Sequence, residues 1–332
     1  MQLPRERGPV SARVLQTLRT GRDHVSDLAL GPLDVITDDD VQLALWTIYE
    51  LSFRGFDGLD PDLEWDPALV ALRRRIEARF EQELRDSTRP LLADVGADGD
   101  VGDVGDLLLS LAATAQGPSP AAFLHRHASA EVLLDFLRER SIQQLKESDP
   151  QSFVLPRLSG RAKVALAELQ YDEYGGGRPE RLHQQLYADA LVAVGLDATY
   201  GAYIDEVSAV SLAGANAMTM FGINRRLRGA AMGHLAVFEA SSPVGSRKVA
   251  AGIERLGLPA ATAAYFHEHV EADSVHEQVA SRDICGTLVA EEPELRADVI
   301  FGAACCLHLD ALSAQELMDR WDPPELDEEL AS

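Results

Sequence analysis

Residues 267–278 read HEHVEADSVHEQ and bring three histidines and four carboxylates into twelve positions of what otherwise reads as an apolar helix. On a helical wheel His269, Asp273 and His276 stand at i, i+4 and i+7, so they project from one face. Tyr265 precedes them on that face, which makes it the apolar side of the helix. Two imidazoles and a carboxylate on a buried stripe are costly unless something pairs with them. A metal ion would do so, and the alternative is a solvated polar helix face.

Three further expected helices carry inward-pointing donors by the same wheel test. Glu173 extends a leucine stripe, His183 shares the apolar face of the next helix, and Glu239 extends an alanine- and leucine-containing stripe. Glu180 forms E-x-x-H with His183 and is a rival to Glu173, but it falls in a first helical turn, where a carboxylate already favours the helix dipole. A lone inward Glu or His is more often a satisfied core residue. Together, the oxygen-rich set with imidazoles suits iron or manganese better than zinc.

The rest of the chain predicts an all-α fold. No stretch alternates like a β-hairpin, and Thr37 with Asp40 predicts a capping box before an apolar helix. Residues 1 to about 32 look poorly ordered. Breaks are expected at the glycine-rich 174–179 and at SSPVG, residues 241–245. From about residue 118, the expected helices are 120–147, 159–174, 179–196, 200–222, 225–241, 246–256, 259–282 and 293–320.

Composition excludes several classes of partner. With 54 acidic and 30 basic residues, the formal charge is −24, which would repel nucleic acid and anionic membranes. No apolar run reaches the length of a membrane span, and the N-terminus has no apolar signal core. The three cysteines lack disulfide-like or C-x-x-C spacing, which indicates a reducing compartment. We therefore expect a cytoplasmic protein.

Other site types fit poorly. The acidic loop at about 93–106 is no EF-hand, because the twelfth position counted from Asp94 is Gly105 rather than Glu. The chain has neither a G-x-S-x-G elbow nor a Walker loop. Haem needs one proximal histidine and would leave the inward carboxylates without a use.

Four motifs resemble the haem-oxygenase-like di-iron oxidases and oxygenases, a group of iron-containing redox enzymes. The motifs are ERSIQQLKESDP (139–150), YDEYGGGRPERLH (171–183), FEASSP (238–243) and HEHVEADSVHE (267–277). The most specific features are a ten-residue Glu-to-His gap across a glycine-rich break and H-x-x-x-D-x-x-H downstream. The resemblance covers roughly residues 118 to 320. It implies a haem-oxygenase-like helical bundle (118–322) with an N-terminal helical extension (1–117) and an acidic tail (323–332).

The resemblance also implies a ligand set. It assigns Glu147, Glu173 and His183 to the first half of the bundle, and Glu239, His269, Asp273 and His276 to the second. Glu147 follows Arg140 and Gln144 on its own helix face, so periodicity alone predicts that it is solvated and only the resemblance places it at iron.

The function implied by the resemblance is O2-dependent oxidation at two ferrous ions. The expected substrate is a small metabolite such as an amino acid or a fatty-acid derivative, and the expected outcome is N-oxygenation, desaturation or oxidative C–C cleavage, as part of a biosynthesis. Turnover would need an electron donor, namely a reductase, a ferredoxin or a small reductant. The N-terminal region would pack on the bundle or mediate a homodimer. The alternatives are a non-catalytic metal-binding or scaffold protein, and a cofactorless oxidase that would lack most of the carboxylates.

Overall fold

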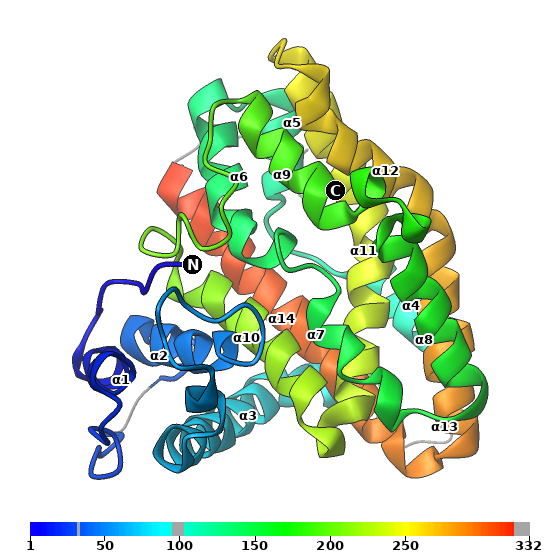
Figure 1. Cartoon of the computed structure of the whole chain (residues 1–332). Coiled ribbons are helices and arrows are strands. Elements are labelled where there is room, and N and C mark those ends of the chain that lie inside the picture. The colour runs from blue at the N-terminus through cyan, green and yellow to red at the C-terminus, as the bar shows by residue number, and fades with distance from the viewer. Residues whose placement is uncertain (32–33, 95–102, 322–332) are drawn as a thin grey trace.

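The computed structural model describes residues 1–31, 34–94 and 103–321, apart from the side chains of Asp94, Asp273 and Ser274. Every regular element in these ranges is a helix, which confirms the all-α prediction (Figure 1). The α-helices are α1 (Pro9–Thr20), α2 (Asp39–Glu50), α3 (Pro67–Asp94), α4 (Val104–Thr114), α5 (Pro120–Arg126), α6 (Ala130–Gln144), α7 (Asp149–Ser152), α8 (Gly160–Glu173), α9 (His183–Ala193), α10 (Ala209–Ile223), α11 (Arg228–Arg255), α12 (Ala260–Gln278), α13 (Thr287–Glu291) and α14 (Arg296–Trp321).

Helix α11 is the centre of the bundle. It packs along α12 and α14 and also touches α4 and α5 (Figure 1). Its approach to α14 is close because two glycines face the partner backbone. A Cβ on Gly233 would lie 1.8 Å from the carbonyl oxygen of Val299, and one on Gly302 would lie 1.9 Å from that of Ala230. Only glycine allows the two helices to meet at this separation.

Helix α11 also runs unbroken through residues 241–245, so the break predicted there is wrong. Pro243 lies inside the helix and has no amide hydrogen to donate to the carbonyl four residues earlier, which belongs to Glu239. The helix tolerates the loss because the flanking turns are held by packing against α12 and α14. Pro243 therefore leaves the carbonyl of the candidate ligand Glu239 without its helical hydrogen bond, but it does not end the helix.

The N-terminal residues are more ordered than the sequence predicts. Residues 9–20 form α1, and the Asp40 carboxylate accepts hydrogen bonds of 2.7 Å from the backbone amides of both Val10 and Ser11. Asp40 therefore caps α1, and Asp38 caps α2 in place of the expected Thr37–Asp40 box. Helices α1 to α3 share a hydrophobic cluster with α11 and α14, so the N-terminal region packs on the bundle.

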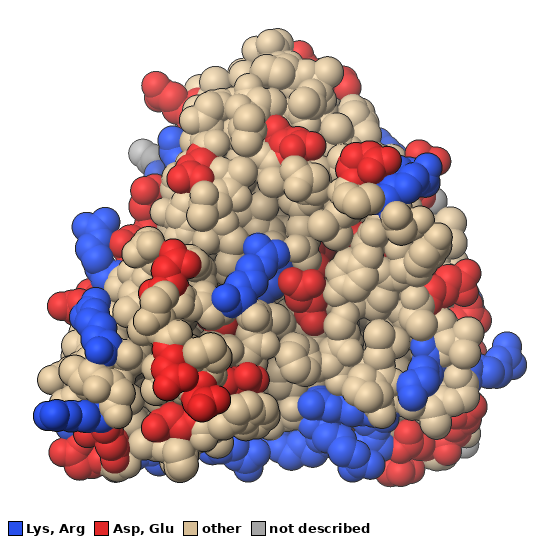
Figure 2. Space-filling model, in the orientation of Figure 1, with Lys and Arg blue, Asp and Glu red and all other residues tan. Residues whose placement is uncertain are grey.

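One described helical segment, Pro293–Trp321, is long and apolar enough to cross a membrane, because it contains an 18-residue window with a mean hydropathy of 1.4. The prediction that no apolar run reaches this length is therefore wrong. More than half of that window (56%) is buried inside the protein, where α14 packs on α3, α10 and α11. The core helix of a folded domain can be as long and as apolar as a membrane-spanning helix, so this composition alone does not indicate a membrane span. On the face shown in Figure 2, acidic and basic side chains are interspersed among neutral ones.

Candidate metal centre

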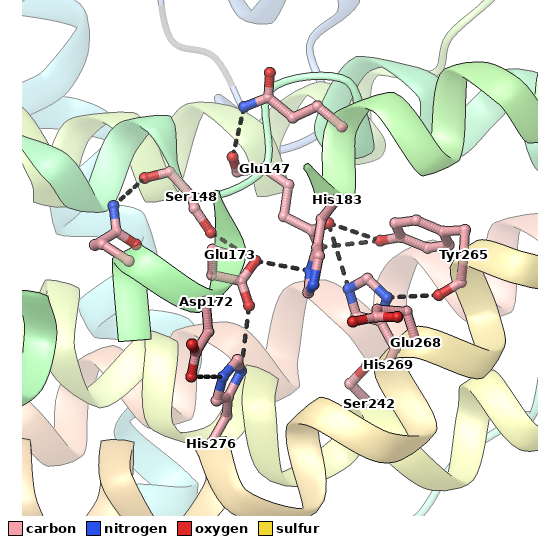
Figure 3. A network of polar contacts seen from close by, with 12 residues as sticks. Glu147, Ser148, Asp172, Glu173, His183, Ser242, Tyr265, Glu268, His269 and His276 are labelled. Atoms are coloured by element: carbon pink, nitrogen blue, oxygen red, sulfur yellow. Dashed lines mark hydrogen bonds and ion pairs between the residues drawn. The ribbon is translucent and has the colours of Figure 1, made fainter. Parts of the chain in front are cut away.

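Six of the seven predicted ligand side chains lie together inside the bundle, and all six are buried. Figure 3 shows five of them, all except Glu239. The six come from the turn after α6, the last residue of α8, the first residue of α9, the middle of α11, and the middle and last turn of α12. The side chain of the seventh, Asp273, lies outside the described residues. The six are Glu147, Glu173, His183, Glu239, His269 and His276.

The first group consists of Glu147, His183 and His269, whose donor atoms all lie within 4.8 Å of one another. Nε2 of His269 is 3.4 Å from Oε2 of Glu147, and the two imidazole ring centroids are 4.5 Å apart. Tyr265 donates its hydroxyl hydrogen to Glu147, with distances of 3.0 and 2.9 Å to the two carboxylate oxygens. One carboxylate and two imidazoles thus converge on a single point.

The second group consists of Glu173, Glu239 and His276, again within 4.8 Å of one another. Nδ1 of His276 lies 3.2 Å from Oε1 of Glu173 and 3.6 Å from Oε2 of Glu239. Asp273 precedes His276 by three residues on the same helix, so its backbone lies one turn from this group.

Glu173 connects the two groups. While its Oε1 faces His276, its Oε2 lies 3.1 Å from Nδ1 of His183 in the first group (Figure 3). A carboxylate whose two oxygens face two separate donor sets has the arrangement of a bridging ligand.

The ten-residue gap between Glu173 and His183 closes through the glycine-rich segment. Gly175, Gly176 and Gly177 all have positive φ, from 61° to 77°, a conformation that other residues adopt only with strain. A Cβ on Gly175 would lie 2.6 Å from the backbone nitrogen of Leu182. These glycines let the chain reverse so that the end of α8 and the start of α9 meet at the site.

Ser148, which follows the candidate ligand Glu147, has a strained backbone conformation. Ser148 is the only described non-glycine residue with positive φ, at 66°, and it directly follows Glu147. Its hydroxyl donates to Oε2 of Glu173 at 2.9 Å, and its carbonyl accepts from Nε2 of Gln170 at 2.8 Å. Such strain persists only where the surroundings impose it and is commonest at functional sites.

Polar contacts on the side away from the glutamates orient two of the imidazoles. Nδ1 of His269 lies 2.8 Å from the carbonyl oxygen of Tyr265. Because a carbonyl can only accept, Nδ1 carries the proton, and Nε2, which faces Glu147, is the nitrogen available to a metal ion. In His276, Nε2 lies 3.6 Å from Asp172 Oδ2 while Nδ1 faces the two glutamates. A carboxylate or carbonyl behind a histidine is the usual support of a metal-binding imidazole.

Burial and ionic contacts act in opposite directions on the charged groups. Burial favours the neutral form of Glu173, but the nearby His183 and His276 outweigh it and hold the Glu173 pKa well below its usual value. Burial likewise lowers the His183 pKa, yet the Glu173 carboxylate raises it overall. Burial, and then the Glu147 charge, raise the Tyr265 pKa well above its usual value, so Tyr265 remains a hydrogen-bond donor.

The donor set fits a hard or borderline cation. Nδ1 of His183 is buried and close to Glu173, but the contact lacks hydrogen-bond geometry. A cation between the imidazole nitrogen and the carboxylate would satisfy both. Three carboxylates and three imidazoles without thiolates suit iron or manganese, as expected.

The two rival glutamates differ in burial, and residues that carried no signal in the sequence also surround the site. Glu180 is exposed, whereas Glu173 is buried at the junction of the two groups. His267 and Glu268 pair with Glu254 and Arg181 away from the site. Ser148 and Asp172 had no signal in the sequence, because a lone serine and an off-stripe aspartate are ordinary surface residues.

A cavity of about 390 Å³ lies between α6, α11, α12 and α14, and Tyr265 forms part of its wall. Arg140 and Gln144 also line it. The polar stripe that runs along α6 toward Glu147 therefore faces an internal space. This explains why helical periodicity wrongly predicted a solvated Glu147.

A protein-family model described as iron-containing redox enzyme matches residues 134–311. The match includes every candidate ligand and lies inside the range of the resemblance. No curated protein matches the chain.

Proposed function

Because the chain belongs to the iron-containing redox enzyme family, we propose that it is a di-iron oxidase or oxygenase that uses O2 to oxidise a small molecule. The observation that carries this proposal is the position of Glu173, whose two carboxylate oxygens face one donor group each. Two such groups joined by one carboxylate suit a pair of metal ions better than a single ion.

In this proposal Glu147, His183 and His269 hold one ferrous ion, and Glu239 and His276 hold the other with Asp273. Glu173 bridges the two. Ferrous iron bound there would supply electrons for the reduction of O2. The remaining work belongs to the protein, which fixes the ligand geometry and limits the access of water.

The cavity beside Tyr265 is the proposed substrate site. Its volume of about 390 Å³ lies in the range of small-molecule pockets, about 300–1,000 Å³. Phe136, Phe238 and Phe266 supply apolar walls that would exclude water from the reacting end. Tyr265 stays protonated and keeps Glu147 in place through its hydroxyl.

The remaining expectations complete the proposal. An electron donor, which we take to be a reductase, a ferredoxin or a small reductant, would return the iron to the ferrous state between turnovers. The protein would act in the cytoplasm, where its free cysteines stay reduced, and as a homodimer.

Anaerobic titration with ferrous iron tests the proposal directly. We expect two irons bound per chain, and O2 consumption when a reductant such as ascorbate is supplied. Glu173→Gln should abolish the binding of at least one iron, because an amide is a poor bridging ligand. Glu180→Gln is the matched control, since Glu180 is an exposed glutamate seven residues away in the same connection.

Two outcomes would contradict the proposal. Uptake of one iron or none by the wild-type chain would exclude a di-iron site. Uptake of two irons without O2 consumption under any reductant would instead identify a metal-binding protein that does not turn over.

A further inference from the structure

The end of α2 contacts the turn that carries Glu147. This turn, residues 145–148, joins α6 to α7 and includes Ser148, whose backbone is strained. Strain of this kind persists only where the surrounding structure imposes it. Part of that surrounding structure is the end of α2, which belongs to the N-terminal region and lies outside residues 134–311, the range that the family model matches.

Consecutive side chains at the end of α2 reach the turn and the residues beside it. Glu50 forms a buried ion pair with Lys146, and the ammonium nitrogen of Lys146 lies 4.2 Å from the centre of the Phe53 ring. The Phe53 ring packs edge-on against Phe153, with the ring centroids 5.4 Å apart. The next residue, Arg54, makes the contacts that come nearest to the candidate ligands.

The Arg54 guanidinium bonds to two different segments of the site. Its Nη2 lies 2.8 Å from the backbone oxygen of Leu145 and 2.7 Å from the side-chain oxygen Oε1 of Gln184. Nε2 of Gln184 in turn donates to the backbone oxygen of Glu147 at 2.8 Å. Because Gln184 directly follows His183, a single arginine side chain is linked to the chain segments of two candidate ligands.

Gln184 fixes the separation between these two segments. It is buried, and it lies 37 residues beyond Glu147 in the sequence. The donor atoms of Glu147 and His183 must nevertheless converge within 4.8 Å to hold one ion. A buried amide that bonds one segment to the other holds them together before any ion binds. Arg54 orients that amide, because it donates to the amide oxygen while the amide nitrogen donates to Glu147.

The guanidinium of Arg54 is itself held in place, although 42% of the side chain is exposed. It lies over the Tyr200 ring, 4.9 Å from the ring centre, and 3.9 Å from Oδ2 of Asp149. The backbone is fixed by Gly55, which has a φ of 63° and donates its amide hydrogen to the Glu50 carbonyl oxygen at 2.9 Å. Arginine suits this position because its planar group bonds several acceptors and also stacks on an aromatic ring.

We propose that Arg54 is a positioning residue for the first metal-binding group, and that the N-terminal region sets the metal affinity of that group through it. This inference rests on the proposed function, because it assigns a role at the same di-iron site. The route runs from Arg54 to Gln184, and from Gln184 to the backbone that carries Glu147. Because the route ends at the first group, the effect of losing Arg54 should be confined to that group.

Hydrogen exchange in the metal-free protein tests the contacts without iron. Arg54→Met removes the donors but retains an apolar stem of similar length, so the amides of residues 145–149 and of the start of α9 should exchange faster than in the wild type. Arg7→Met is the matched control. Arg7 also belongs to the N-terminal region and donates to two backbone oxygens, those of Ile204 and Val207, neither of which adjoins a candidate ligand.

Anaerobic titration with ferrous iron tests the role in metal binding. Arg54→Met should bind the iron of the first group about tenfold more weakly, the lower end of the usual effect of losing an outer partner of a metal ligand. Arg54→Lys should recover part of the affinity. The binding step that His269→Gln abolishes identifies the first group. The second iron should bind as in the wild type, and Arg7→Met should bind both irons normally.

Gln184→Leu shows whether Arg54 acts through Gln184. If it does, the double variant Arg54→Met/Gln184→Leu should bind the first iron about as well as Gln184→Leu alone, because the second substitution already interrupts the route. Additive losses would show that Arg54 acts separately from Gln184 and would overturn the assigned route.

The assignment would also be overturned by wild-type iron affinities in Arg54→Met, or by equal weakening in Arg54→Met and Arg7→Met, which would indicate a general loss of stability. Unchanged hydrogen exchange in metal-free Arg54→Met would refute this inference alone, whatever the iron titration gives. Failure of the wild-type chain to bind two irons would instead refute the proposed function.

Discussion

The hydroxyl of Tyr265 lies 2.9 and 3.0 Å from the two carboxylate oxygens of Glu147, and the same side chain lines the adjoining cavity. The tyrosine therefore joins the space that would hold a substrate to the group that would hold a metal ion. Its ring also packs on His269, with the ring centroids 4.1 Å apart. A substitution of Tyr265 should therefore affect both the cavity and the position of Glu147.

Tyr265→Phe should weaken the binding of one of the two ferrous ions by about 10- to 100-fold, the usual effect of losing a hydrogen bond to a metal ligand. The other ion should bind as in the wild type, because Glu147, the carboxylate to which Tyr265 donates, belongs to the first group. Anaerobic iron titration measures both affinities. Tyr187→Phe is the control, since this buried tyrosine donates to the Leu137 carbonyl and to no candidate ligand. Equal iron affinities in Tyr265→Phe and the wild type would contradict the prediction.

Gly302→Ala should destabilise the fold by about 3 kcal/mol or more, because the new Cβ would lie 1.9 Å from the Ala230 carbonyl oxygen. The obstacle is backbone, so the two helices would have to move apart. Chemical denaturation gives the difference in the free energy of unfolding. Gly214→Ala is the control: a Cβ at this position would meet nothing within 4 Å, so the change should be neutral or stabilising by up to about 1 kcal/mol. Similar stability of the two variants would mean that α11 and α14 can separate at little cost.

Helical periodicity was sufficient to predict most of the site. It placed Glu173, His183, Glu239, His269 and His276 on buried faces, because these side chains continue apolar stripes. It could not place Glu147, whose stripe includes Arg140 and Gln144. A polar stripe looks the same in a sequence whether it faces solvent or an internal cavity, and only the family resemblance identified this one.

The errors in the predicted fold have a common cause, namely contacts between residues far apart in the chain. The first helix was missed because its cap is Asp40, which lies 29 and 30 residues beyond the amides that it accepts. The break expected at 241–245 is absent because packing on α12 and α14 holds α11 together across Pro243. Local propensities carry no information on either contact.

Acidic conditions should stabilise the contact between α3 and the segment before α2. Burial, and then the neighbouring Asp34 carboxyl, raise the pKa of Glu83 from 4.5 to about 7. The folded protein therefore holds a proton between about pH 4.5 and 7 that the unfolded chain has released. This contribution is fully present below the lower value and is lost as the pH rises through about 7.

The measurement for Glu83 is the free energy of unfolding at about pH 5 and about pH 8. The loss of stability between the two should be smaller in Glu83→Gln, whose amide stays neutral at both. Asp86→Asn on the exposed face of α3 should leave the pH dependence unchanged. If the free energy of unfolding of Glu83→Gln depends on pH as strongly as that of the wild type, a group other than Glu83 causes the pH dependence.

Lys146→Met should be among the most destabilising single changes in the chain. Lys146 directly precedes Glu147 and forms a buried ion pair with Glu50 of α2, with side-chain exposures of 3% and 0%. Tyr200 also donates to this carboxylate, at 2.8 Å. Removing the ammonium group leaves a buried charge unpaired, which costs about 3–5 kcal/mol. Because the pair fixes the turn that carries Glu147 to α2, iron affinity should fall as well.

The double variant Lys146→Met/Glu50→Met distinguishes the lost pair from lost packing. It removes both charges, so it should recover most of the stability that Lys146→Met alone loses, since an apolar replacement of a whole ion pair is often neutral. Denaturation curves for the wild type, both single variants and the double variant form a complete cycle. A double variant that is less stable than either single variant would show that the N-terminal region is held at the metal-centre turn by side-chain packing, and that the ion pair itself contributes little.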